Sequence, residues 1–194
     1  MARWEPGAAE RLQKAALELF ATRGFEQTTA TDIAQSVGLT ARTFFRHFSD
    51  KREVLFHGQH LFVQAFLAGV DTAPPGASPI AIVVCVLRSA ASLFPDERRS
   101  HSRTRQSVID QNPALQEREL HKLAGLATTL AEALRARGVE EPAATLAAQS
   151  GVTVFGVAFA QWIRAGEQRS LADIAEAVLS ELLTLTGDYD GFRP

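Results

Sequence analysis

The sequence is poor in features that mark secreted proteins and membrane proteins. Its 194 residues contain one cysteine, Cys85, so no disulfide can form within the chain, as expected in a reducing compartment. No apolar segment follows the first residues, so we expect no signal peptide and a cytoplasmic location. The longest apolar run, residues 80–87, is far shorter than the roughly 20 residues that span a bilayer, and we interpret it as a buried helix.

Motifs of catalysis and metal binding are also missing. The sequence has no glycine-rich phosphate-binding loop, no HExxH zinc motif and no GxSxG nucleophile motif. Among its five histidines, His57 and His60 are three residues apart on one predicted helix face, but no third ligand accompanies them. We therefore expect no catalytic residues, no metal and no cofactor, and a protein that is not an enzyme.

The net charge of −2 is unevenly distributed along the chain. Residues 1–52 contain 8 Lys and Arg against 6 Asp and Glu, whereas residues 53–194 contain 12 against 16. A mildly basic N-terminal segment on an acidic remainder is compatible with nucleic-acid binding by that segment alone.

Apolar residues recur at three- and four-residue steps, and no alternating strand pattern is present. The sequence therefore predicts an all-α fold of about nine helices, after an N-terminal arm of residues 1–7. Breaks, caps and periodicity place a first helix at about residues 8–23, two short helices within residues 28–48, and further helices at about residues 51–70, 80–94, 112–137 and 142–166. The basic segment of residues 98–105 opens another helix before the one at 112–137, and Ser170 caps the last helix.

Residues 28–48 contain the most specific pattern. Thr29 can cap a short helix with Asp32 at the capping-box position, and Gly38 can end that helix. Thr40 can then cap a second helix with apolar positions at Phe44 and Phe48, which we assign to the core. Two short helices joined by a tight turn form a helix-turn-helix, whose second helix lies in the DNA major groove.

The chain therefore divides into a predicted DNA-binding domain, residues 1–52, and a second helical domain, residues 53–194. Both of the last two helices are apolar over a wide face. Such helices can be the core of a monomer or half of a four-helix bundle formed by two chains. We expect a homodimer, since helix-turn-helix proteins usually bind two half-sites.

Residues 11–56 resemble the TetR family of transcriptional regulators. The matching positions, in order and at the family's spacing, are Ala15, Ala16, Leu19, Phe20, Gly24, Phe25, Thr28, Thr29, Ile33, Ala34, Val37, Gly38, Leu39, Thr40, Thr43, Phe44, Phe45, His47, Phe48, Lys51 and Leu55. The resemblance implies three helices for DNA and six for effector binding and dimerisation. Two positions depart from the family: Arg42 stands where a small residue is usual, and Phe45 stands where tyrosine is usual.

Base readout requires side chains near the start of the second helix of the motif. We assign that role to Thr40, Ala41, Arg42, Thr43 and Phe45. Arg42 can bind a guanine in bidentate fashion or contact a phosphate, and Phe45 can contact a thymine methyl. Phosphate contacts are assigned to Thr31, Thr40, Arg46, His47 and Lys51.

The second domain is rich in large apolar residues, as expected of a pocket for a small apolar effector. Candidate pocket residues, which can equally be ordinary core, are Phe62, Phe66, Val84, Leu87, Val108, Leu126, Phe155, Phe159 and Trp162. The arginines of residues 98–105 can bind an anion or form a solvated face.

These features predict a homodimeric repressor that binds a palindromic double-stranded operator and is released by the effector. The predicted helix of residues 51–70 would couple the two domains, because it starts beside the motif. A helical small-molecule-binding protein or an enzyme with an incidental helix-turn-helix is the alternative. The choice between repressor and activator stays open, as do the operator, the effector and the regulated genes.

Overall fold

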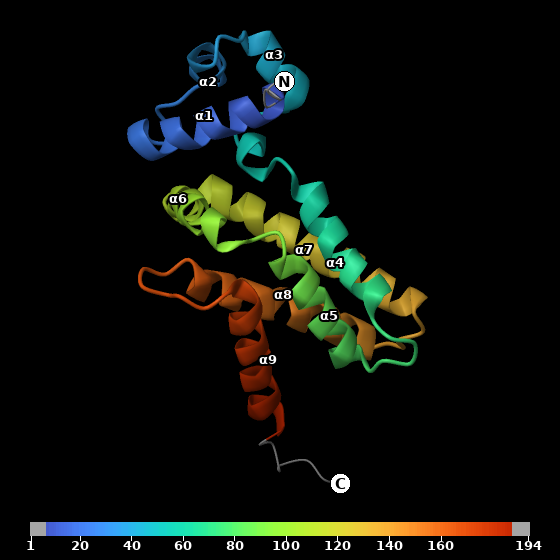
Figure 1. Ribbon diagram of the computed structural model, residues 1–194. Coiled ribbons are helices and arrows are strands. Elements are labelled where there is room, and N and C mark those ends of the chain that lie inside the picture. Colours follow the sequence, from blue (N-terminus) through green and yellow to red (C-terminus); the bar gives the residue numbers. More distant parts are fainter. Residues whose placement is uncertain (1–6, 188–194) are drawn as a thin grey trace, which may run out of the picture. The chain divides into compact units, whose positions relative to one another are not determined.

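The computed structural model describes residues 7–187, so the expectation for the N-terminal arm falls outside it, except for Gly7. These residues form nine α-helices and two short 3₁₀-helices without a strand, which confirms the all-α prediction (Figure 1). The α-helices are α1 (Ala8–Arg23), α2 (Ala30–Ser36), α3 (Ala41–His47), α4 (Gln59–Thr72), α5 (Pro79–Ala91), α6 (Arg99–Asp110), α7 (Pro113–Ala136), α8 (Ala143–Trp162) and α9 (Leu171–Gly187). The 3₁₀-helices are η1 (Glu53–Phe56) and η2 (Asp96–Arg98).

The chain forms two compact units that are interleaved in sequence. The first combines Met1–Gln59, as far as it is described, with His101–Leu120, and the second combines His60–Ser100 with the described part of His121–Pro194. The first unit therefore contains the helix-turn-helix together with most of α6 and the start of α7. These units are defined by packing. The predicted boundary between residues 52 and 53 separates two functions along the sequence, and it stays a prediction.

The first unit has its own core. Leu12, Phe20, Ile33 and Phe44 are each 0–3% exposed and bring α1, α2 and α3 together. The same cluster includes the buried side chains of Val54, Leu55, Phe56, Val108, Ile109 and Leu115. Residues from η1, α6 and α7 thus complete the core on which the helix-turn-helix rests.

The expectation of one helix over residues 51–70 is wrong. The chain forms η1, leaves helical geometry at His57 and Gly58, where Gly58 has a φ of +83°, and starts α4 at Gln59. Val54, Leu55 and Phe56 are all buried. All three belong to the core of the first unit, and the positive φ of Gly58, which glycine adopts readily, separates this short segment from α4.

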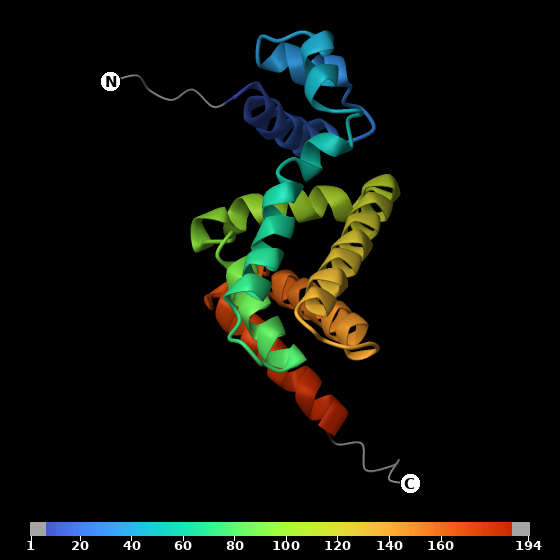
Figure 2. The ribbon, with the colours of Figure 1, turned by 90° about the vertical axis from the view of Figure 1, so that its right-hand side faces the viewer.

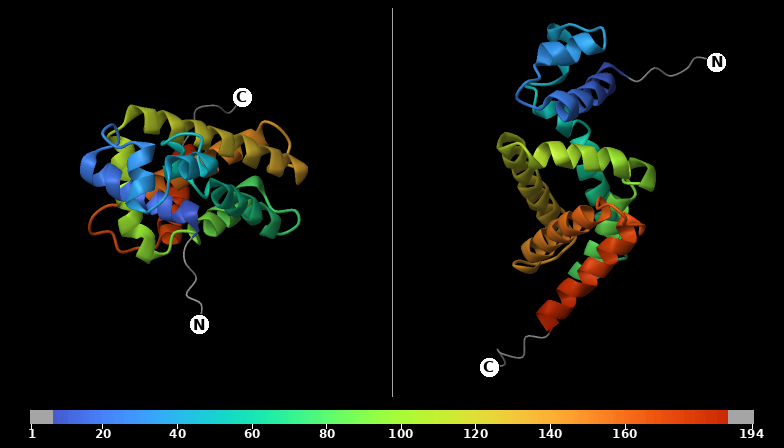
Figure 3. Two further views of the ribbon diagram at one scale, coloured as in Figure 1. Left: turned by 90° about the horizontal axis from the view of Figure 1, so that it is seen from above. Right: turned by 90° about the vertical axis from the view of Figure 1, so that its left-hand side faces the viewer.

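The second unit is built on α5, α8 and α9, which pack on one another (Figures 2 and 3). Its core includes the buried side chains of Val83, Leu130, Phe155, Trp162 and Ile174. A partly buried polar contact joins the ends of two of its helices. The Arg137 guanidinium donates to the carbonyl oxygens of Val70 and Ala73, both at 2.8 Å, and so binds the end of α7 to the end of α4.

Candidate DNA-binding surface

The helix-turn-helix is fixed by the short-range contacts that its sequence predicts. The backbone N–H of Asp32 donates to the Thr29 hydroxyl at 3.1 Å, and the Thr29 N–H donates to the Asp32 carboxylate at 2.8 Å, which completes the capping box. Donation from the Thr29 hydroxyl, and then from its N–H, holds the pKa of Asp32 below its ordinary value. Gly38 has a φ of +70°, and the Thr40 hydroxyl accepts from the Thr43 N–H at 3.2 Å.

The recognition helix α3 has one buried and one exposed side. Phe44 and Phe48 are 0% and 4% exposed, with ring centroids 5.2 Å apart, which confirms their assignment to the core. Arg42, Phe45 and Arg46 lie at i, i+3 and i+4 on the opposite side and are exposed. Together with Thr43 they line an open hollow of about 450 Å³.

The remaining predicted DNA contacts surround this face. Thr31, Thr40 and His47 are exposed, and Ala41 is half-buried at the start of α3. The Thr40 and Thr43 hydroxyls lie 3.1 Å apart, so each has the other as a hydrogen-bond partner. The structure therefore brings Thr40, Ala41, Arg42, Thr43, Phe45, Arg46 and His47 together around α3, with Thr31 near the start of α2.

Lys51 has a different environment. Its ammonium donates to the carbonyl oxygens of Phe25 at 2.8 Å and Thr28 at 3.3 Å, and lies 4.2 Å from the centre of the Phe25 ring. It also precedes η1 rather than starting an α-helix, so the helix N-terminus that would reinforce a phosphate contact there is absent. These contacts fasten the turn between α1 and α2 to the segment that follows α3.

Replacing Lys51 by methionine should therefore act mainly through stability. The change keeps the aliphatic stem but leaves two partly buried carbonyl groups without their donor, at a cost of about 1–3 kcal/mol. Thermal unfolding measures this loss. The slope of log binding constant against log salt concentration should stay unchanged, and a decrease of about 0.9 would instead show a phosphate contact. As a control, replacing exposed Arg46 by methionine should lower the slope without lowering the melting temperature.

A polar network around η1 was not predicted from the sequence. The Arg118 side chain of α7 forms an ion pair with Glu53, and the Arg105 guanidinium of α6 donates to the Leu55 carbonyl oxygen at 3.1 Å. Arg105 also donates to Glu119 at 3.1 Å. Nothing local in the sequence signals these pairs, because their partners lie up to 65 residues apart in the chain.

Most candidate effector residues gather in the second unit. Phe62, Phe66, Phe155 and Phe159 pack there with Trp162 and Phe94, and successive ring centroids are 4.9–6.1 Å apart. We call these six residues the aromatic cluster. Val84, Leu87 and Leu126 belong to or pack against the same core. Phe66, Phe155 and Trp162 are buried, whereas Phe62, Phe94 and Phe159 are partly buried and pack against them.

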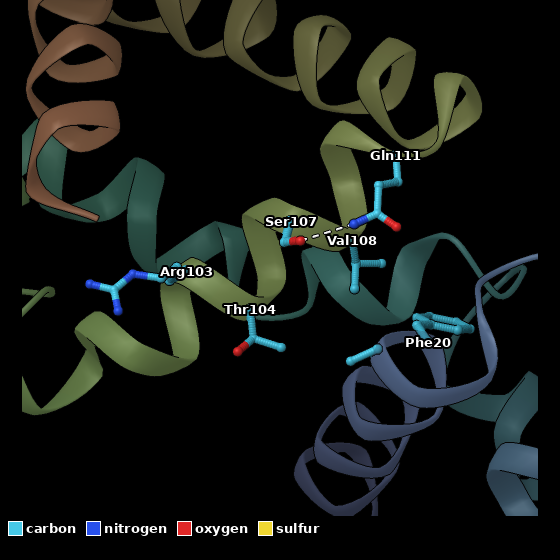
Figure 4. Close-up of a pocket in the computed structure, with 7 residues that line it drawn as sticks. Phe20, Arg103, Thr104, Ser107, Val108 and Gln111 are labelled. Carbon is cyan, nitrogen blue, oxygen red and sulfur yellow. Dashed lines mark hydrogen bonds between the residues drawn. The ribbon is translucent and has the colours of Figure 1, made fainter. Parts of the chain in front are cut away.

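Val108 is separated from that group, since it belongs to the core of the first unit. There it lines a hollow of about 300 Å³ between α1 and α6, with Phe20 on the α1 side (Figure 4). On the α6 side, the Gln111 side-chain amide donates to the Ser107 hydroxyl at 3.0 Å. The sequence could not separate Val108 from the other candidates, because all of them are large apolar residues on predicted helices.

Two of the four arginines in residues 98–105, Arg99 and Arg105, are partly buried and engaged in contacts within the protein, whereas Arg98 and Arg103 are exposed. Arg99 donates to the carbonyl oxygens of Glu167 and Arg169, pairs with Asp96, and lies 5.1 Å from the Trp162 ring centre. Arg105 is engaged in the network around η1. The sequence offered an anion site or a solvated face for this segment. Arg99 and Arg105 instead contact other parts of the protein, so neither interpretation fits these two residues.

Helix α8 is unusually apolar. By length and composition it would be able to cross a membrane, and only 39% of its most apolar window is buried. The sequence from Ala143 to Trp162 contains no charged residue, and Leu146 and Val157 are 62% and 47% exposed. An interface helix of a folded protein has the same character.

The first unit presents a helix-turn-helix whose second helix exposes two arginines and a phenylalanine. This arrangement defines a DNA-binding protein of the helix-turn-helix class. Comparison with known proteins gives the family. The sequence model for bacterial regulatory proteins of the tetR family matches residues 12–57, and the model for the MftR C-terminal domain matches residues 77–186. The chain belongs to the TetR family of transcriptional regulators.

Three relatives illustrate the similarity. The HTH-type transcriptional regulator TcmR of Streptomyces glaucescens is 42% identical over 71 residues, which are 37% of this chain and 31% of TcmR. MftR of Mycobacterium tuberculosis, which carries the name of a mycofactocin biosynthesis transcriptional regulator, is 26% identical over 77% of this chain and 76% of its own length. Thermus thermophilus FadR, a TetR family repressor solved with lauroyl-CoA, has a TM-score of 0.55 at 24% identity, covering 96% of this chain and 97% of FadR.

These matches confirm the resemblance seen in residues 11–56 and extend it to most of the chain. They favour a DNA-binding transcriptional regulator over a carrier or enzyme with an incidental helix-turn-helix. The structural likeness to FadR shows the fold.

Proposed function

We propose that the protein is a cytoplasmic, homodimeric repressor that binds a palindromic operator and is released by a small apolar effector. The exposed face of α3 is the observation that carries the proposal. Each protomer places this helix in a major groove, at half-sites about one helical turn or a multiple of it apart. Electrophoretic mobility shift with DNA flanking its own gene is the test, and no shift at low salt would contradict the proposal.

Arg42 is proposed to read a guanine. It lies in the first turn of α3, is exposed, and has no salt-bridge partner among those found in the described residues. A guanidinium can donate to O6 and N7 of guanine together. Thr31, Thr40, Arg46 and His47 would then contact phosphates and set the register of α3.

Replacing Arg42 by alanine should relax base preference at one position of each half-site. The expected loss on the preferred operator is about 1–3 kcal/mol for each half-site, with little loss on DNA that lacks the guanine. Arg42→Lys is the matched control, because lysine keeps the charge but lacks the planar fork. Selection from a random DNA pool measures the preference. An unchanged base preference in Arg42→Ala would show that Arg42 does not read a base.

Dimerisation is proposed through α8 and α9. Helix α8 carries no charge and exposes Leu146 and Val157, which we call the exposed stripe of α8, and α9 exposes Leu183 and Leu185. Apolar side chains of this kind are buried where two chains form a four-helix bundle. A symmetric dimer pairs the same patch of both chains. It therefore supplies the two DNA-binding domains that a palindromic operator requires.

The effector is proposed to enter the aromatic cluster. This cluster brings six aromatic side chains together, and its rings would have to separate to admit a ligand. FadR, which has the same fold, was solved in complex with lauroyl-CoA, and this supports the proposal of an effector with an apolar part. Binding would shift the protein toward the opened state only through higher affinity for that state. The segment that runs through η1 into α4 connects the helix-turn-helix to the aromatic cluster along the chain.

The function as proposed involves no catalysis and no cofactor.

A further inference from the structure

Phe45 is an exposed aromatic side chain on the recognition helix. It is 56% exposed, while its neighbour Phe44 is 0% exposed. It lines the same hollow as Arg42 and Arg46, so an apolar ring lies on the same face as two cationic side chains. Among the exposed large apolar side chains of residues 7–187, Phe45 is the one aromatic, and its place on the recognition helix points to a role in contact with a partner.

The ring has a defined support. Its centroid lies 5.4 Å from that of Phe44 at an interplanar angle of 81°, an edge-to-face contact that is favourable for aromatic pairs. Phe44 is in turn packed against buried Phe48. Contact with Phe44 therefore restricts the phenyl ring of Phe45 before the partner binds. For this reason the side chain loses little entropy on binding.

The partner of this face, on the proposed function, is the DNA major groove. The groove is lined with hydrogen-bond donors and acceptors, and its distinctive apolar group is the C5-methyl of thymine. A phenyl ring has no donor or acceptor with which to read the other groups. It also lacks the hydroxyl through which a tyrosine could bind a phosphate.

We propose that Phe45 determines operator specificity by contacting a thymine C5-methyl. Phe45 is three residues after Arg42, a rise of about 4.5 Å along α3, whereas stacked bases are about 3.4 Å apart. The thymine therefore lies one or two base steps from the guanine read by Arg42. The chemistry recognised is the methyl group, so 5-methylcytosine presents the same feature where it replaces cytosine at that position.

The test removes the methyl alone. An operator is first selected from a random DNA pool, and each thymine is then replaced singly by 2′-deoxyuridine. At one position in each half-site, replacing thymine by deoxyuridine should weaken binding of the unmodified protein about fourfold, as estimated from burial of one methyl-sized group. Replacement at that position in both half-sites should weaken binding about 15-fold. Phe45→Ala should bind the thymine and deoxyuridine operators equally. At the same position, 5-methylcytosine should bind more tightly than cytosine to the unmodified protein only.

Arg46→Ala is the control variant: it should bind all operators more weakly while keeping the ratio between thymine and deoxyuridine. Equal loss on deoxyuridine in the unmodified protein and in Phe45→Ala, or no loss at any thymine, would overturn the assignment of Phe45. Failure to bind any DNA is a different result, which would contradict the proposed function. Because Phe45 is exposed, circular dichroism of Phe45→Ala should match that of the unmodified protein.

Discussion

Replacing Val157 by glutamate should convert the proposed dimer into monomers and abolish specific operator binding. Val157 lies on the exposed, uncharged stripe of α8 and is 47% exposed in the single chain. A carboxylate there is accommodated by a monomer in water. In a symmetric dimer it would be transferred from water into an apolar interface, at a cost of several kcal/mol for an unpaired charge.

The effect on DNA binding should be larger than that of any single contact. A monomer binds one half-site. A dimer holds its second DNA-binding domain near the second half-site, which raises the affinity for the operator by roughly 10²–10⁴-fold. Light scattering after gel filtration measures the mass, and fluorescence anisotropy with a labelled operator measures the affinity. Melting temperature at low protein concentration should change little, since Val157 is not core in the single chain.

Ala124→Glu is the matched control. Ala124 is exposed on α7, in the same unit, and its replacement introduces the same charge on another helix. This variant should stay dimeric and bind the operator normally. If Val157→Glu remains a dimer at micromolar concentration, the interface lies elsewhere and the exposed stripe of α8 requires another explanation.

Short-range features could be predicted from the sequence. The capping box at Thr29 and Asp32, the turn at Gly38 and the cap at Thr40 each depend on residues two to four positions apart, and the structure contains all of them. The separation of buried Phe44 from exposed Arg42 follows from helical periodicity in the same way. Local chemistry therefore defines the DNA-binding motif almost completely.

Long-range contacts could not be predicted in this way. The sequence gives no sign that the Lys51 ammonium binds two carbonyl groups more than 20 residues earlier, or that Arg105 and Arg118 meet η1. For the same reason, Val108 could not be assigned to the core of the first unit. Each depends on which helices pack together, and amphipathic periodicity shows that a helix has an apolar face without identifying its neighbour.

The close crossing of α4 and α5 provides the strongest test of the packing in the second unit. Gly69 of α4 is buried, and a Cβ atom added there would lie 2.3 Å from Val86 Cα and 2.7 Å from Val86 N. Both atoms belong to the backbone of α5, so no side-chain rotation can relieve the clash. The two helices must separate, and the packing of Phe66 and Val83 in the shared core would loosen with them.

Gly69→Ala should therefore lower the free energy of unfolding by about 2–3 kcal/mol, toward the upper end for overpacked cores, even though alanine favours helix by about 1 kcal/mol. Chemical denaturation measures the loss. Gly125→Ala on α7 is the control with the opposite sign, because its added Cβ meets nothing within 4 Å and the helix should gain about 0.5–1 kcal/mol. Equal stabilisation by both substitutions would show that α4 and α5 do not approach at Gly69, and that another contact holds Phe66 in the aromatic cluster.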